Sequence, residues 1–182
     1  MQSGGEVLRK VIVLPHDNEW TVLFAEEADK LKSILGEQVD SVHHFGSTSV
    51  PGLAAKPIID ILLVVEDITF VDNYNDGLQV IGYTGKGENG IAGRRYFQKG
   101  GDDRTHHLHI YQIGSPEIHR HLVFRDYLRS HPFAVKEYGE LKKQLGQQFP
   151  YDIDSYILGK EDLASKIQTD AINWHQKSQN QQ

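Results

Sequence analysis

The 182-residue sequence contains no cysteine, which excludes disulfide bonds and thiolate metal sites. It also lacks an excess of basic residues, since 19 lysines and arginines stand against 25 acidic residues and give a formal net charge of −6. A surface of this sign argues against general nucleic-acid binding. No apolar run approaches the length of a membrane span, and the first ten residues lack the apolar core of a signal peptide. We therefore predict a cytoplasmic protein without membrane contacts.

A chain of this length fits one domain with a sizeable hydrophobic core. We expect a flexible lead-in over residues 1–10, a single domain over residues 11–176 and a disordered, Gln-rich tail over residues 177–182. Apolar residues at three- and four-residue steps predict helices over residues 18–35, 67–80, 116–129, 133–149 and 160–176. Strands are predicted over residues 42–45, 57–65, 94–99 and 105–113 and from residue 81, with the glycine-rich stretch 85–93 as a flexible flap. The pattern gives no indication of the oligomeric state.

One stretch, residues 41–66, combines two predicted strands with a turn of small residues between them. The second strand is almost wholly apolar but contains Asp60, and a charge in such a strand must be paired, metal-bound or at an open edge of the sheet. In the turn, Gly46 allows the backbone to approach a ligand closely, and Ser47 and Ser49 offer hydroxyl and amide groups to phosphate oxygens. These features predict a site for a small phosphorylated ligand such as a nucleotide.

Ser47 stands 13 positions ahead of Asp60, and this spacing resembles the signature of the nucleotidyltransferase superfamily. More closely, the stretch HHFGSTSVPGLAAKPIIDI resembles the GrpB family, a group of bacterial-type proteins placed in the nucleotidyltransferase fold, mostly without an assigned reaction. The resemblance continues over residues 94–97, 106–109 and 124–129 and spans roughly residues 15–174. It implies an α/β (α+β) fold with a mixed β-sheet, flanking helices packed on one side and a helical C-terminal third.

The resemblance also implies a catalytic magnesium held by two carboxylates two residues apart, with Asp60 as the first of them. The second is missing, because the corresponding position is Leu62, and the sequence departs here from the pattern of nucleotidyl transfer. His107 and His109 share one face of a predicted strand, at a spacing that lets two imidazoles bind one metal. If that strand lies beside Asp60, as the resemblance implies, the three side chains form a site better suited to zinc or manganese than to magnesium. The alternative is that they are structural and hold no cofactor.

Basic and histidine side chains supply the remaining candidates. Lys56, Arg94 and Arg125 are predicted phosphate ligands. The alternatives are a solvated Lys56 beside the strand and an ordinary ion pair of Arg125 with Asp126. His44 directly precedes the turn and is expected to line the same site. The other basic candidates, of which the lysines lie on helices where such residues are usually solvated, are Arg95, Arg129, Lys142 and Lys160.

Two functions are consistent with these features. The first is a metal-dependent enzyme that performs phosphoryl or nucleotidyl transfer, or hydrolysis, on a nucleotide or other phosphorylated small molecule, with Asp60 as a catalytic residue. The concentration of His, Arg and Asp side chains favours it. The second is a non-catalytic ligand-binding or accessory module, since the resemblance implies that some relatives are fused to dephospho-coenzyme A kinase. Leu62 favours this second function.

Overall fold

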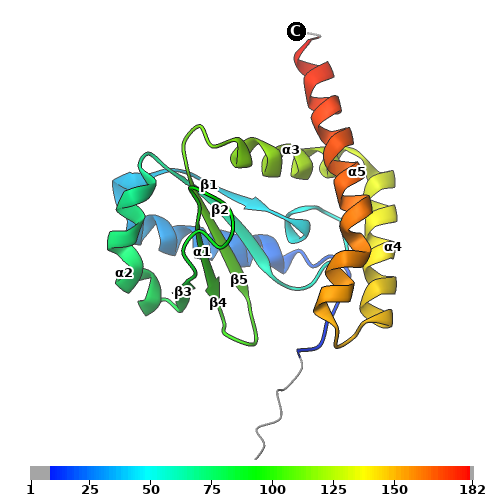
Figure 1. Cartoon of the computed structure of the whole chain (residues 1–182), viewed down its shortest axis with the longest axis horizontal. Coiled ribbons are helices and arrows are strands. Elements are labelled where there is room, and N and C mark those ends of the chain that lie inside the picture. Colours follow the sequence, from blue (N-terminus) through cyan, green and yellow to red (C-terminus); the bar gives the residue numbers. More distant parts are fainter. Residues whose placement is uncertain (1–8, 181–182) are drawn as a thin grey trace, which may run out of the picture.

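A mixed sheet of five strands lies at the centre of the protein in this computed structural model, which describes residues 9–180. The strands run in the order β1 (Val39–Phe45), β2 (Ile59–Val65), β5 (His106–Gln112), β4 (Arg95–Lys99) and β3 (Tyr83–Gly85). β2 and β5 are parallel, whereas the other neighbouring strands are antiparallel. The first residues of β2 and β5 therefore lie side by side at one end of the sheet (Figure 1). The mixed sheet predicted from the sequence is confirmed.

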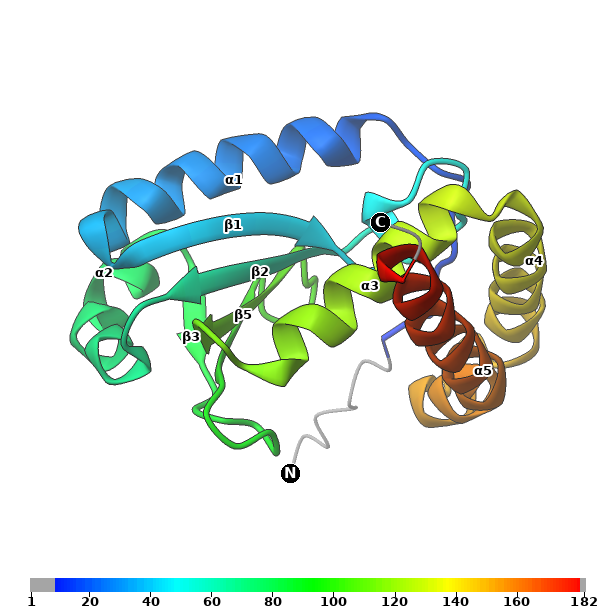
Figure 2. The ribbon, with the colours of Figure 1, turned by 90° about the horizontal axis from the view of Figure 1, so that it is seen from above.

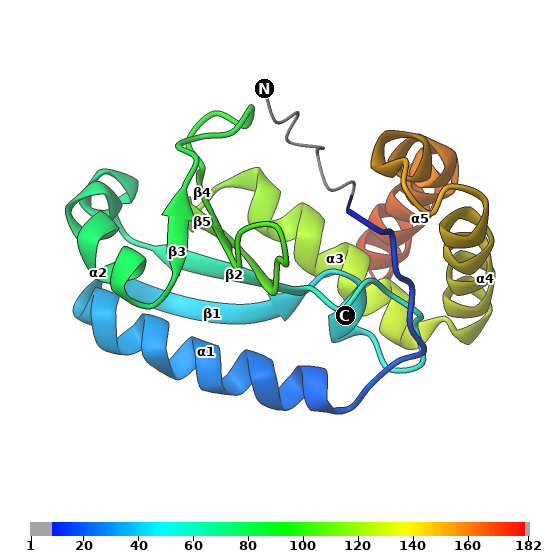
Figure 3. The same cartoon turned by 90° about the horizontal axis from the view of Figure 1, so that it is seen from below.

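One face of the sheet is apolar and is covered by α1 (Glu19–Leu35) and α2 (Asn75–Val80). Figures 2 and 3 show α1 running along the sheet beside β1. Alternate residues of a strand point to the same face, so every second residue of β2 belongs to this main core. From β2 and α1 the core contains Ile59, Ile61, Leu63, Val65, Trp20, Leu31 and Leu35.

The helix predicted over residues 67–80 is divided in two. A 3₁₀ helix spans Ile68–Tyr74 and leads directly into α2. At its start, the Asp67 side chain accepts a hydrogen bond of 2.8 Å from the Thr69 amide. This local bond competes with α-helical pairing, and the β-branched residues that follow have a low α-helix propensity. The regular α-helix therefore begins only at Asn75.

Helix α3 (Pro116–Ser130) covers the opposite face of the sheet, where its Ile118 packs against Leu62, Val64 and Tyr111. Helices therefore flank both faces, and the expectation that they pack on one side is wrong. Helices α4 (Pro132–Gln148) and α5 (Ile153–Gln179) lie side by side beyond one end of the sheet (Figure 1) and form the predicted helical C-terminal third. Among residues 9–180, no helix is long and apolar enough to cross a membrane.

Helix α5 is longer at both ends than the sequence predicts. It begins at Ile153, where Asp152 caps it by accepting a 3.0 Å hydrogen bond from the Ser155 amide. Gly159 does not break this helix, because the glycine allows close packing against Leu145 of α4; a Cβ there would collide with that side chain. At the other end the helix reaches Gln179. Most of the expected lead-in and the end of the tail lie outside the described residues.

The segment between β1 and β2 is held against the C-terminal helices. It opens with Gly46 and a short 3₁₀ turn, Ser47–Ser49. A second hydrophobic core joins the segment to α3, α4 and α5 and contains Val50, Leu53, Leu128, Tyr138 and Ile167. This packing brings the Gly46–Ser47 turn and the start of β2 close to side chains that are distant in sequence.

Candidate functional site

The Gly46–Ser47 turn lies directly on the carboxylate of Asp60. Asp60 is the second residue of β2 and pairs with Phe45, the last residue of β1. Gly46 has a φ of +69°, which favours glycine, and a Cβ at this position would collide with Asp60 Oδ2. The Asp60 side chain is partly buried and keeps 26% of its surface exposed. Gly46 is therefore required by the close approach of turn and carboxylate.

Asp60 is paired with His107 on the neighbouring strand. The two residues are direct partners in the parallel β2–β5 pairing, and His107 Nδ1 lies 3.3 Å from Asp60 Oδ1. Burial works to raise the pKa of Asp60, but the hydrogen bond and charge of His107, with the charge of Lys160, hold it below its usual value. The histidine strand therefore lies beside Asp60, as the resemblance implied, and Asp60 is negatively charged at neutral pH.

His109 is occupied by a protein partner. It lies on the same face of β5 as His107, and Arg94 Nη1 donates a 3.3 Å hydrogen bond to its Nδ1. A guanidinium group only donates, so Nδ1 accepts and the ring proton lies on Nε2. Burial lowers the pKa of His109 to about 3, which keeps the ring neutral. In this tautomer neither ring nitrogen offers a lone pair to a metal ion.

The residues present do not fit the divalent metal that the sequence resemblance implies. Within residues 9–180, no three His, Asp or Glu side chains converge as a group that would hold a metal ion. Leu62, at the position of the missing carboxylate, is fully buried against Phe45, Val64 and Tyr111. The expected site of Asp60, His107 and His109 is thus not formed in this geometry, because Arg94 engages the third member.

A lysine from α4 approaches the turn from the other side. Lys142 Nζ donates a 2.8 Å hydrogen bond to Ser47 Oγ and lies 4.6 Å from the centre of the Tyr138 ring. The residue is buried, with 1% of its surface exposed. Burial, followed by the charge of Lys160, lowers the pKa of Lys142 well below its usual value, while Asp60 opposes this shift. The expectation that Lys142 is solvated is therefore wrong.

Two further lysines interact electrostatically with Asp60. Lys56 precedes β2 and Lys160 lies on α5, and each ammonium lies 5.5 Å from the centre of the Tyr156 ring. Burial, then the charge of Lys160, lowers the pKa of Lys56 to about 8. Burial also lowers the pKa of Lys160, and the charge of Asp60 opposes both shifts. Neither lysine forms an ion pair among the described residues. We call Lys56, Lys142 and Lys160 the lysine cluster.

Ser49 and Arg125 brace the turn from within the protein. Ser49 Oγ donates a 2.6 Å hydrogen bond to the Gly46 carbonyl, and the Ser49 carbonyl accepts two hydrogen bonds from Arg129, of 3.0 and 2.8 Å. Arg125 donates to the His44 carbonyl at 3.1 Å and to Asp126 at 2.8 Å. These groups have protein partners in the geometry shown and hold the backbone on which the site is built.

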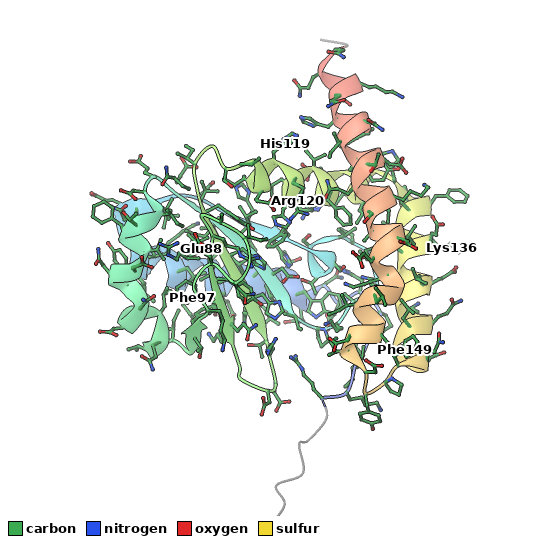
Figure 4. The ribbon with its side chains drawn as sticks, in the orientation of Figure 1. Glu88, Phe97, His119, Arg120, Lys136 and Phe149 are labelled. Carbon is green, nitrogen blue, oxygen red and sulfur yellow. The ribbon has the colours of Figure 1, made fainter. Side chains whose placement is uncertain are left out.

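His44 and Arg94 lie away from the turn's open side. His44 points to the α1 face of the sheet, where it stacks on Phe24 at 4.8 Å, so it does not line the side of Asp60 as expected. Arg94 is buried and donates to the carbonyls of Glu88 and Asn89 at 3.1 and 2.6 Å. It therefore ties the glycine-rich flap, on which Figure 4 labels Glu88, to β5.

Two hollows formed by the described residues lie elsewhere. One, of about 640 Å³, is lined by residues 10–15 and the end of α4, and another, of about 280 Å³, lies between α4 and residues 52–54. Neither is lined by Asp60, Ser47 or the lysine cluster. The contacts of Asp60 with His107 and of Lys142 with Ser47, and not the size of a hollow, therefore mark the candidate site.

Comparison with known proteins gives the family. The model of the family described as "GrpB protein" matches residues 10–170. The chain belongs to the GrpB family. A crystal structure of the conserved protein GrpB from Enterococcus faecalis has a TM-score of 0.87 and 49% sequence identity, and the match covers 90% of this chain and 99% of that one. The family predicted from the sequence is confirmed.

Two further relatives are longer than this GrpB-family chain, which spans about half of each. The UPF0157 protein YqkA of Bacillus subtilis is 51% identical over 91% of this chain, which spans only 48% of that protein. A protein named dephospho-CoA kinase from Mycolicibacterium paratuberculosis is 27% identical over 90% of this chain and 46% of its own length. A looser likeness in fold, with a TM-score of 0.45 and 19% identity over 72% of this chain, is to the Cid1 poly(U) polymerase.

Proposed function

We propose that this GrpB-family chain binds a small phosphorylated ligand, such as a nucleotide, at the Gly46–Ser47 turn. The observation that supports this proposal is that Lys142 donates a hydrogen bond to Ser47 of the turn, while Asp60 interacts electrostatically with all three members of the lysine cluster. Cations that are largely removed from water are costly unless negative charge compensates them. Asp60 is the carboxylate whose charge acts on all three lysines. A phosphate group supplies the compensating charge.

The ligand is a small molecule and not a nucleic acid. The chain carries a net charge of −6, which opposes the approach of a long polyanion. The lysine cluster is local and comes from three separate elements, so it forms a point of positive charge and not a basic stripe. The proposal keeps the protein in the cytoplasm, as its sequence predicts, where phosphorylated small molecules are abundant.

A ligand-binding or accessory module is favoured over a transferase. Metal-dependent phosphoryl or nucleotidyl transfer relies on cations held by paired carboxylates to stabilise the charge that develops on the reacting oxygens. Here Asp60 lacks its partner, because the buried Leu62 occupies that position. The match to less than half of a protein named dephospho-CoA kinase supports a module that accompanies another domain. An enzyme that transfers or hydrolyses a phosphoryl group is the second candidate, and the ionised Asp60 carboxylate at the turn favours it.

Calorimetric titration of the full chain with pyrophosphate and with ATP, in buffer containing Mg²⁺, tests the proposal. We expect binding of at least one probe, weakened by K160Q and unchanged by K136Q. Lys136 is the matched control because it is exposed on α4, where Figure 4 labels it. Absence of binding to the wild-type chain, or equal binding by the two variants and the wild type, would overturn the assignment of the ligand to this turn.

A further inference from the structure

The charges at the turn are those of an anion site and not of a metal site. Three lysine side chains interact electrostatically with one carboxylate, and that carboxylate is already paired with His107. A divalent cation brought to Asp60 would be repelled by the lysine cluster and would find a single oxygen-bearing side chain. Magnesium binding through one protein carboxylate is weak unless other ligands join it.

The lysine cluster is built into the fold. Lys142 is fixed by Ser47 at 2.8 Å and by the Tyr138 ring, and Lys56 and Lys160 lie over the Tyr156 ring. Tyrosine faces attract cations, so these rings hold the ammonium groups in place without neutralising them. The positive charge remains available to a ligand that reaches the turn.

We propose that the lysine cluster neutralises the ligand's phosphate directly, so that this GrpB-family chain binds its ligand without a divalent metal. This inference rests on the function proposed above and specifies its chemistry. With all three lysines protonated, the positive charge of the cluster exceeds the single negative charge of Asp60, and this surplus suits the charge of about −2 on a phosphate monoester. A phosphodiester, with one negative charge, leaves part of the surplus uncompensated. The ligand class is therefore a small molecule with a terminal phosphate.

The ligand also changes the proton content of the site. Burial lowers the pKa of all three lysines in the absence of a ligand, and a phosphate dianion favours their charged forms. Binding is then accompanied by proton uptake wherever a lysine was neutral beforehand. Uptake of protons is a readout that metal-mediated binding through Asp60 would not produce at these lysines.

The test compares calorimetric titrations of the full chain in EDTA and in Mg²⁺, with pyrophosphate and ATP as probes. We expect binding in EDTA at least as tight as in Mg²⁺, with proton uptake visible as a dependence of the heat on the buffer's ionisation enthalpy. K56Q and K160Q each weaken it about tenfold, whereas K136Q does not. These two sites are partly exposed, so the variants test the inference even if a change at the buried Lys142 prevents folding.

The outcomes separate the two proposals. Binding that requires Mg²⁺ would overturn the metal-free inference and leave the proposed function standing. Binding in EDTA that K56Q and K160Q leave unchanged would also overturn it, because the lysine cluster would then not carry the charge. No binding in either buffer would overturn the proposed function and this inference together. As a check of ligand class, AMP should compete with the bound probe more strongly than 3′,5′-cyclic AMP, and the reverse order would contradict the terminal-phosphate assignment.

Discussion

Two groups of basic side chains flank Asp60 and differ in how their charge is balanced. On the sheet side, burial lowers the pKa of His109 to about 3 and of His121 to about 4, so both rings are neutral. Each ring has an arginine partner. Arg94 Nη1 lies 3.3 Å from His109 Nδ1, and Arg120 Nη2 lies 3.3 Å from His121 Nε2. On the helix side, the lysine cluster has one hydrogen bond, to Ser47, and no ion pair among the described residues.

This difference assigns a structural role to the histidine side and, under the proposed function, a binding role to the lysine side. The histidine side is satisfied by the protein itself and contributes to the stability of the sheet face under α3. The lysine side has positive charge that the described residues do not fully compensate, at a cost in stability that proteins commonly accept at functional sites. A substitution on the histidine side should therefore lower the free energy of unfolding and leave phosphate binding intact. A substitution of a buried lysine should raise the free energy of unfolding and weaken phosphate binding.

The largest effect is expected at the turn that both sides share. G46A should lower the free energy of unfolding by about 3 kcal/mol, because it combines a positive φ with a collision against Asp60. Gly87 is the matched control, since its φ is +60° but a Cβ at that position would have no atom within 4 Å. G87A should cost about 1 kcal/mol. Urea denaturation measures both, and equal losses would show that the contact with Asp60 is unimportant.

A smaller loss is expected on the histidine side. H109L should lower the free energy of unfolding by about 2 kcal/mol, because it leaves the buried Arg94 guanidinium without one of its acceptors. H119L is the control, since His119 is exposed on α3 and is labelled there in Figure 4; its cost should stay below about 0.5 kcal/mol. Phosphate binding by refolded H109L should persist. Loss of binding with unchanged stability would place His109 in the site and erase the distinction between the two sides.

The lysine side should respond in the opposite direction. K142M replaces a buried cation with an apolar side chain of similar length, and it should raise the free energy of unfolding by about 1.5 kcal/mol while it weakens phosphate binding. K136M, at an exposed position of the same helix, should change neither quantity appreciably. Denaturation and calorimetry on the same samples check both parts. A destabilised K142M would mean that Lys142 serves mainly to fix Ser47.

The sequence predicts the sheet side better than the lysine side. Period-two and period-3.6 patterns locate most strands and helices, and alternation places His107 and His109 on one face because side-chain direction in a strand is fixed by geometry. The contact of Arg94 with His109 was not predictable from this pattern. It depends on how a glycine-rich loop folds back onto the sheet, and such a path has no periodic signal.

The sequence names Lys56, Lys142 and Lys160 as basic candidates but does not predict that they act together, although it holds a signal that the two helical lysines are buried. Lys142 lies four residues after Tyr138 and three before Leu145, within the apolar stripe of α4. Lys160 has the same relation to Tyr156 and Leu163 on α5. Lysines are usually solvated, and that general preference outweighed helix phase in the prediction. A lysine in the apolar stripe of a helix is a better indicator of a functional charge than its residue type alone suggests.

The smallest expected effect is the pH dependence of affinity and stability that arises from Lys56. Lys56 has a pKa of about 8, lowered by burial and by the charges of Lys160, Arg9 and Arg104, with Asp60 opposing. Its charge is present below this value and lost above it, so affinity for pyrophosphate in EDTA should fall about fivefold between about pH 7 and about pH 9. The stability of the ligand-free protein should change in the opposite direction and rise as pH increases from about 8 toward 10.5. The reason is that the lowered pKa of Lys56 in the folded protein lets the unfolded chain bind more protons over this range. K56Q should reduce both slopes. An affinity that stays constant over this range would show that Lys56 does not contact the ligand, which would restrict the positive charge of the site to the two helical lysines.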